Sequence, residues 1–156
     1  MTTRRDVFTG AGALAAAWAL PGAARAQGDD PRYSACALQV VCDAVNRDAS
    51  VEAARERMAA SIARIGRQIA TTKAFLRTFN GTELKLVCLP EYFLTGFPLR
   101  ESRAEWKAKA SIDIDGREYE ALAGIAQRFG VHLAGNLYEN DPNFPELYFQ
   151  ANFVIA

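Results

Sequence analysis

Residues 84–98 read LKLVCLPEYFLTGFP. Leu84–Leu89 is a short apolar run, and such a run predicts a buried strand of a sheet. Pro90 lacks the backbone N–H that a sheet ladder needs, so the predicted strand ends there. Glu91 therefore follows the carboxyl end of a strand, where open α/β sheets bind ligands. A Glu in this place also commonly caps a turn or a helix, and that structural alternative stays open.

Upstream of this stretch, the pattern predicts one strand and one long helix. Tyr33–Val45 is rich in apolar residues, which fits a strand buried on both faces. Asp48 or Ser50 is suited to cap a helix that begins at Val51 and runs to about Leu76. The apolar stripe of that helix consists of Ala54, Met58, Ile62, Ile65, Ile69 and Leu76.

Downstream, the pattern predicts one helix and two strands. Tyr92–Lys109 is expected to be irregular, and Gly116–Phe129 to be an amphipathic helix that ends at a glycine. Val131–Tyr138 and Leu147–Ile155 are predicted strands, and the loop that joins them carries two prolines. The order of elements predicts an α/β fold with parallel strand pairs, closed by an antiparallel hairpin.

Residues 1–26 have the features of an export signal. Arg4 and Arg5 precede a mildly apolar run, and Ala24-Arg25-Ala26 offers a cleavage site before Gln27. The segment resembles a twin-arginine signal peptide, which implies a periplasmic or secreted protein. Because the run is shorter than the roughly 20 residues of a spanning helix, no stable membrane span is expected after cleavage, although an uncleaved anchor is the alternative.

The predicted organisation after the signal is simple: a flexible mature N-terminus over 27–32 and one domain over 33–156. Composition narrows the function of that domain. The 18 basic residues balance 18 acidic ones and half the residues are apolar, which argues against a disordered chain and against a nucleic-acid binder that relies on bulk charge.

Metal and disulfide chemistry are not expected. Cys36, Cys42 and Cys88 lie in predicted strands and are interpreted as small buried hydrophobic residues. A Cys36–Cys42 disulfide is not expected, because six residues of one strand separate the two. The single histidine, His132, is interpreted as a core or edge residue, so neither a metal nor another cofactor is predicted.

Leu89-Pro90-Glu91-Tyr92 followed by Thr95-Gly96-Phe97-Pro98 resembles the first catalytic motif of the nitrilase superfamily of carbon–nitrogen hydrolases. Other segments agree with the resemblance, which covers about residues 33–156. Leu38-Gln39-Val40 is similar to the family's first strand, and Phe129-Gly130-Val131 to the turn that enters a later strand. The resemblance implies that the chain is the N-terminal half of an α-β-β-α sandwich.

The family resemblance also implies a chemistry. A Glu takes the proton of a Cys thiol, the thiolate attacks an amide, nitrile or carbamoyl carbon, a Lys stabilises the developing charge, and water later releases the acid. Glu91 takes the role of the base, and Tyr92 is expected to line the substrate pocket. The implied partners are a small amide or nitrile substrate and, for the full-length protein, further copies in a homo-oligomer.

Two members of the implied catalytic trio have no counterpart in this sequence. The four lysines, at 73, 85, 107 and 109, lie outside the matching context, and the cysteines all precede Glu91. Cys88 is expected about 10 Å back along the strand, too far to share a proton with Glu91. The apolar ending Phe153–Ala156 resembles the middle of a core strand. We therefore expect a truncated chain that is inactive alone.

Three interpretations stay open on the sequence. The chain is the N-terminal part of a carbon–nitrogen hydrolase, the non-catalytic product of a truncated gene, or an exported α/β binding module unrelated to hydrolases. The substrate, and the choice between nitrilase, amidase and carbamoylase, depend on residues beyond this sequence.

Overall fold

Four strands form one sheet in the order β1-β2-β3-β4. The structure is a computed structural model that describes residues 32–156. β1 pairs with β2 and β2 with β3 in parallel, whereas β3 and β4 form an antiparallel hairpin. The strands are β1 (Tyr33–Ala37), β2 (Glu83–Cys88), β3 (His132–Glu139) and β4 (Phe149–Ile155). The predicted α/β class, with parallel pairs and a final hairpin, is confirmed.

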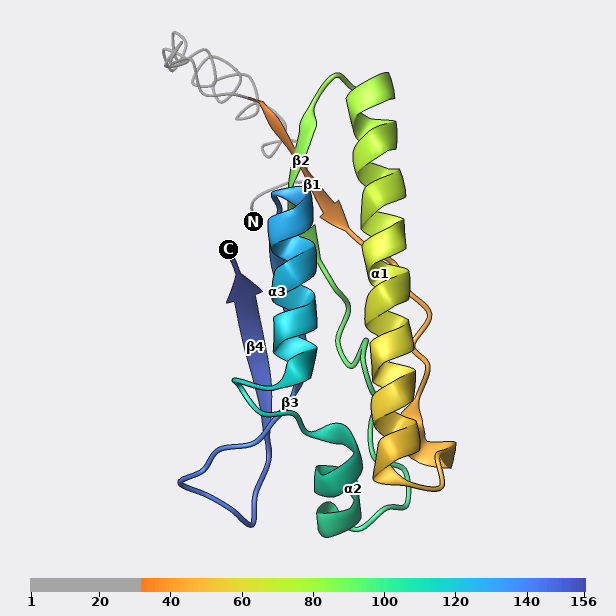
Figure 1. Ribbon diagram of the computed structural model, residues 1–156, viewed down its shortest axis with the longest axis vertical. Helices are drawn as coiled ribbons and strands as arrows, with labels where there is room; N and C mark the ends of the chain where they lie inside the picture. The colour runs from red at the N-terminus through yellow and green to blue at the C-terminus, as the bar shows by residue number, and fades with distance from the viewer. Residues whose placement is uncertain (1–31) are drawn as a thin grey trace, which may run out of the picture. The chain divides into compact units, whose positions relative to one another are not determined.

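Three α-helices connect the parallel strands. α1 (Val51–Phe79) joins β1 to β2, and α2 (Arg103–Ala110) and α3 (Arg117–Phe129) lie between β2 and β3. α1 begins where the side chain of Ser50 accepts a hydrogen bond from the Ala53 amide at 3.2 Å, so Ser50 is the cap. α1 and α3 run side by side (Figure 1).

Both long helices cover the same face of the sheet because the strand order advances in one direction. Right-handed crossovers from β1 to β2 and from β2 to β3 place their helices on the same side. The opposite face carries exposed side chains, among them Cys88 on β2 and Val154 on β4, the latter 71% exposed. The described residues therefore form two layers, one of helices and one sheet, and the outer face of the sheet is uncovered.

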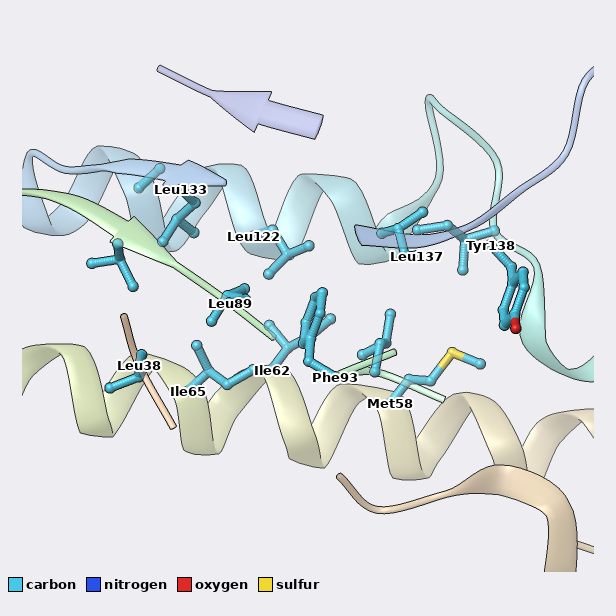
Figure 2. Packing of buried hydrophobic residues seen from close by; sticks show 14 of the residues in the cluster. Leu38, Met58, Ile62, Ile65, Leu89, Phe93, Leu122, Leu133, Leu137 and Tyr138 are labelled. Atoms are coloured by element: carbon cyan, nitrogen blue, oxygen red, sulfur yellow. The ribbon is translucent and has the colours of Figure 1, made fainter. Parts of the chain in front are cut away.

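The core lies between α1 and the covered face of the sheet. Met58, Ile62 and Ile65 point from α1 toward the strands in Figure 2, where Ile62 and Ile65 lie across from Leu89. The predicted stripe of α1 is buried from Ala54 to Ile69, and Leu76 packs against its edge. Burying each such aliphatic side chain contributes roughly 1.5–3 kcal/mol, so this contact is the main support of the sheet.

The first strand is shorter than the sequence predicts. β1 ends at Ala37, and the following segment leads to a short 3-10 helix, η1 (Val45–Arg47). Tyr33, Ala35 and Ala37 are exposed, so the expectation of a strand buried on both faces was wrong. The apolar residues after β1 pack without a ladder, and only Leu38 continues the pairing, through its amide to the Cys88 carbonyl at 2.9 Å.

The segment predicted to be irregular contains a helix. Ser102 caps α2 by accepting from the Glu105 amide at 3.3 Å, and the Glu105 carboxylate accepts from the Ser102 amide at 2.8 Å. This reciprocal pair is a capping box, which the spacing Ser-x-x-Glu announces in the sequence. Only Trp106 and Ala110 of α2 are buried, so its apolar periodicity is too weak to reveal it.

The predicted signal peptide, residues 1–26, and residues 27–31 lie outside the described residues. From residue 32 onward, no helix has both the length and the apolar character that a bilayer span requires.

Candidate active site

Glu91 lies three residues beyond the end of β2, at the carboxyl edge of the parallel strands. The amide of Leu89 still bonds to the Ala134 carbonyl at 2.8 Å, so the chain leaves the sheet only at Pro90. Phe93 and Leu94 then turn into the core, whereas the Glu91 side chain stays exposed. The aromatic and apolar residues that flank Glu91 in sequence therefore anchor its turn rather than enclose its carboxylate.

The turn after Glu91 has an unusual backbone. Tyr92 has a φ of 54°, in the left-handed region that side-chain-bearing residues rarely adopt. Its carbonyl accepts hydrogen bonds from the Gly96 amide at 3.0 Å and from the Cys42 thiol at 3.0 Å. Such a conformation costs roughly 1–3 kcal/mol and persists only where neighbouring contacts hold it. The peptide next to Glu91 is thus fixed by its surroundings.

Gly96 explains the glycine of the motif. Its φ is 74°, and a Cβ on it would lie 2.9 Å from the Cβ of Ala44. The neighbouring Thr95 carbonyl accepts from the Val45 amide at 3.0 Å, and Asn46 Nδ2 donates to the Phe97 carbonyl at 3.1 Å. The turn that carries Glu91 is therefore hydrogen-bonded to residues 44–46, and a side chain at position 96 would push the two segments apart.

Aromatic rings pack beside the turn. The Tyr92 ring stacks on Tyr138 of β3 with centroids 5.5 Å apart and also contacts Phe97 at 5.9 Å. Trp106 and Tyr148 meet Tyr138 edge-on at 5.8 and 5.3 Å. Burial above all, and then the neighbouring Tyr92, raise the pKa of the Tyr138 phenol. The Tyr138 phenol thus stays neutral at physiological pH. The stacked rings hold Tyr92, and with it the turn, against β3.

A chain of carboxamide side chains starts at Glu91. Gln150 Nε2 donates to Glu91 Oε1 at 2.6 Å and to Asn136 Oδ1 at 3.0 Å. Asn136 Nδ2 in turn donates to Asn152 Oδ1 at 3.0 Å. The three amides lie on the β3-β4 hairpin. Sequence reasoning missed them, although polar residues at alternate positions of the last predicted strand were a visible signal.

An open hollow of about 630 Å³ lies on the uncovered face of the sheet beside Glu91. Its walls include Cys88, Asn136, Gln150, Asn152 and Phe153. Tyr92, expected to line the substrate pocket, is not part of this wall and instead packs on Tyr138. The structure therefore brings Glu91 together with a thiol and three amides, and a substrate contact of Tyr92 stays a prediction.

The comparison with protein families identifies the family of the chain. The model of the carbon–nitrogen hydrolase family matches residues 38–156, which include the Glu91 turn and the hairpin. The chain belongs to the carbon–nitrogen hydrolase family. A comparison with curated proteins gave no match.

Seen as part of a carbon–nitrogen hydrolase, the hollow holds one of the three groups that the family resemblance implies. Within residues 32–156, Glu91 is its only carboxylate and no lysine lines it. Lys73 donates instead to the Phe129 carbonyl at 2.8 Å, and Lys109 to the Asn46 carbonyl at 3.3 Å. These two lysines hold helices and loops together.

The cysteines differ from their predicted environments. Cys42 and Cys88 are exposed and Cys36 is half-buried, so the interpretation of all three as buried hydrophobic residues was wrong. All three are free thiols, and Cys42 lies beyond the end of β1, so Cys36 and Cys42 do not share the strand that the sequence predicts for both. Cys88 lines the same hollow as Glu91. His132 is exposed at the start of β3, outside the core.

Proposed function

We propose that this carbon–nitrogen hydrolase chain supplies the general base of a nitrilase-type reaction on a small amide, nitrile or carbamoyl compound. One observation carries the proposal: Glu91 is held at the carboxyl edge of the sheet, beside an open hollow, with one carboxylate oxygen bonded to Gln150 at 2.6 Å. A general base needs this combination of fixed position and access to the reacting group.

The proposed reaction passes through a covalent intermediate. Glu91 accepts the proton of a Cys thiol, and the thiolate attacks the carbon of the C–N bond. With an amide or a carbamoyl compound, ammonia or an amine leaves with the proton taken from the thiol, an acyl-enzyme remains, and water hydrolyses it to the acid. With a nitrile, addition of the thiolate gives a thioimidate, which takes up a first water before ammonia leaves, and a second water then hydrolyses the acyl-enzyme. The developing negative charge on the substrate is stabilised by a Lys. Family membership disfavours the alternative of a binding module unrelated to hydrolases.

We further propose that the Lys and the nucleophilic Cys come from sequence that follows residue 156, so that residues 1–156 alone are inactive. The absence of a lysine from the hollow, within residues 32–156, supports this. Cys88 lines the hollow but lies on the strand that delivers Glu91, so we assign it no catalytic role. A non-catalytic product of a shortened gene is the remaining alternative.

The assay for this proposal is ammonia release from simple amides and nitriles. It compares residues 1–156 with a longer chain translated through the codons that follow position 156. We expect turnover by the longer chain only. Turnover by the short chain that disappears in Cys88→Ser would overturn the assignment of the nucleophile. Inactivity of both chains on all substrates would favour the non-catalytic alternative.

We also propose export by the twin-arginine route to the periplasm or beyond, on the basis of Arg4, Arg5 and the Ala24-Arg25-Ala26 site. Fusing residues 1–32 to a reporter tests this. Replacing both arginines by lysine should retain the reporter in the cytoplasm, and a reporter that still leaves the cytoplasm contradicts the route. Assembly of the full-length protein into a homo-oligomer is a proposal that rests on the family resemblance alone.

A further inference from the structure

The carboxamide chain from Glu91 to Asn152 has a role beyond the proposed reaction scheme. We propose that Gln150 is a positioning residue: it anchors Glu91 Oε1 and leaves Oε2 as the oxygen that takes the thiol proton. This inference rests on the proposed function, because it assigns a task to Glu91 as the base. Within residues 32–156, Oε2 accepts no hydrogen bond, whereas Oε1 is bonded at 2.6 Å.

The direction of the chain follows from the charge at its end. An ionised carboxylate only accepts hydrogen bonds, so Gln150 must turn its nitrogen, not its oxygen, toward Glu91. The second N–H of that nitrogen goes to Asn136 Oδ1, which turns the Asn136 nitrogen toward Asn152. The orientation of each amide is therefore fixed by its neighbour, and in each of these hydrogen bonds a donor nitrogen meets an acceptor oxygen.

The hairpin register is what brings the amides together. Asn136 lies opposite Asn152, and Gln150 lies opposite Tyr138, two residues further along the same face. A slip by one residue would turn Gln150 to the other face and break the contact with Glu91. Tyr138 also stacks on Tyr92, so the same strand position fixes the backbone beside Glu91 and places its amide partner.

The bond from Gln150 is suited to both states of the base. When Oε2 receives the proton, Oε1 becomes the carbonyl oxygen of a carboxylic acid and still accepts from Gln150 Nε2. Gln150 gives up no proton and acts only through Glu91. Without it, the exposed Glu91 side chain gains rotational freedom. Misplacement of a catalytic group lowers kcat by up to about a hundredfold, and substrate binding is not expected to change.

The first test needs no turnover. In the ¹⁵N-labelled chain, the side-chain amide resonances of Gln150 should shift in Glu91→Ala, because one of its two N–H groups loses the carboxylate. The resonances of Gln127, exposed on α3, serve as the control and should not move. Identical Gln150 resonances with and without the Glu91 carboxylate would overturn the proposed bond, whatever the enzyme catalyses.

The second test is kinetic and uses the chain that turns over substrate. Gln150→Met keeps the length of the side chain without its donors, and we expect kcat to fall about tenfold to a hundredfold while KM changes less than about threefold. Gln127→Met is the matched control with unchanged kinetics. An unchanged kcat in Gln150→Met, or a loss confined to KM, would overturn the positioning role. Full turnover in Glu91→Gln would instead overturn the proposed function and leave the resonance test of the bond standing.

Discussion

At the scale of single residues, the position of Glu91 depends on neighbours that carry no chemistry. Tyr92 takes a left-handed backbone, and Gly96 allows the loop to pass close to Ala44. The strain at Tyr92 is held by the Gly96 amide and the Cys42 thiol, which both donate to its carbonyl. The glycine of the motif is thus required by a backbone contact and not by the reaction.

Gly96→Ala should lower the free energy of unfolding more than Gly81→Ala does, although both glycines have a left-handed backbone. Gly81 has a φ of 64° and open space around the site of a Cβ, so Gly81→Ala meets backbone strain alone, roughly 1–2 kcal/mol. Gly96→Ala adds the clash with Ala44, for a further 1–3 kcal/mol or so. Urea unfolding of the two variants measures the difference, and equal losses would mean that the Ala44 contact relaxes freely.

At the scale of elements, the sequence predicted what periodicity reports and missed what depends on pairing. α1 and α3 were foreseen because their apolar stripes repeat over several turns. β1 was drawn too long because an apolar run looks the same whether it forms a ladder or packs as a loop. Gln150 was overlooked as a partner of Glu91, because their contact requires the register of β3 and β4.

The loop between the Glu91 turn and α2 is held by hydrogen bonds to the carboxylate of Glu101. The Glu101 carboxylate accepts from the amides of Leu99 and Arg100 at 3.0 and 3.1 Å and from Asn46 Nδ2 at 2.9 Å. These bonds, the Arg100 amide first, lower the pKa of Glu101 from 4.5 to about 2. Asn46 also donates to the Phe97 carbonyl, so its side chain joins the Glu101 loop to the turn that carries Glu91.

The stability of the chain should therefore depend on Glu101 in acid. Because the folded-state pKa lies below the unfolded one, its contribution is complete above about pH 4.5 and is lost as the pH falls toward 2. Glu101→Gln should lower stability at neutral pH and flatten its pH dependence between 4.5 and 2. Urea midpoints across that range test this, and parallel curves for the two proteins would show that Glu101 is not the titrating group.

At the scale of the whole molecule, one face of the sheet is covered by helices and the other face is uncovered. The shared direction of the two crossovers gathers α1 and α3 on one side and leaves the hollow beside Glu91 on the other. In the α-β-β-α sandwich that the family resemblance implies, a second sheet covers such a face. The carbon–nitrogen hydrolase match over residues 38–156 agrees with a chain that forms one layer of helices and one sheet of such a sandwich.

Cys88 reports whether that face becomes covered. It is exposed on β2, so in a background with Cys36→Ser and Cys42→Ser an aromatic disulfide reagent should label the native short chain readily. In the longer chain with a second sheet, labelling of Cys88, followed by peptide mass apart from the nucleophilic Cys, should slow by at least about tenfold, because local opening is then the route to the buried thiol. Equal rates in the two chains would contradict the sandwich.

If Glu91 is the base of the proposed reaction, kcat must depend on its carboxylate, and Glu91→Gln in the longer chain measures that dependence. The substituted amide can still accept from Gln150, so the fold and KM should persist while the proton acceptor is lost. Glu120→Gln, exposed on α3, is the matched control. We expect kcat to fall about 10²- to 10⁴-fold in Glu91→Gln and to stay unchanged in Glu120→Gln. A Glu91→Gln enzyme that keeps its full kcat would contradict the assignment of Glu91 as the base.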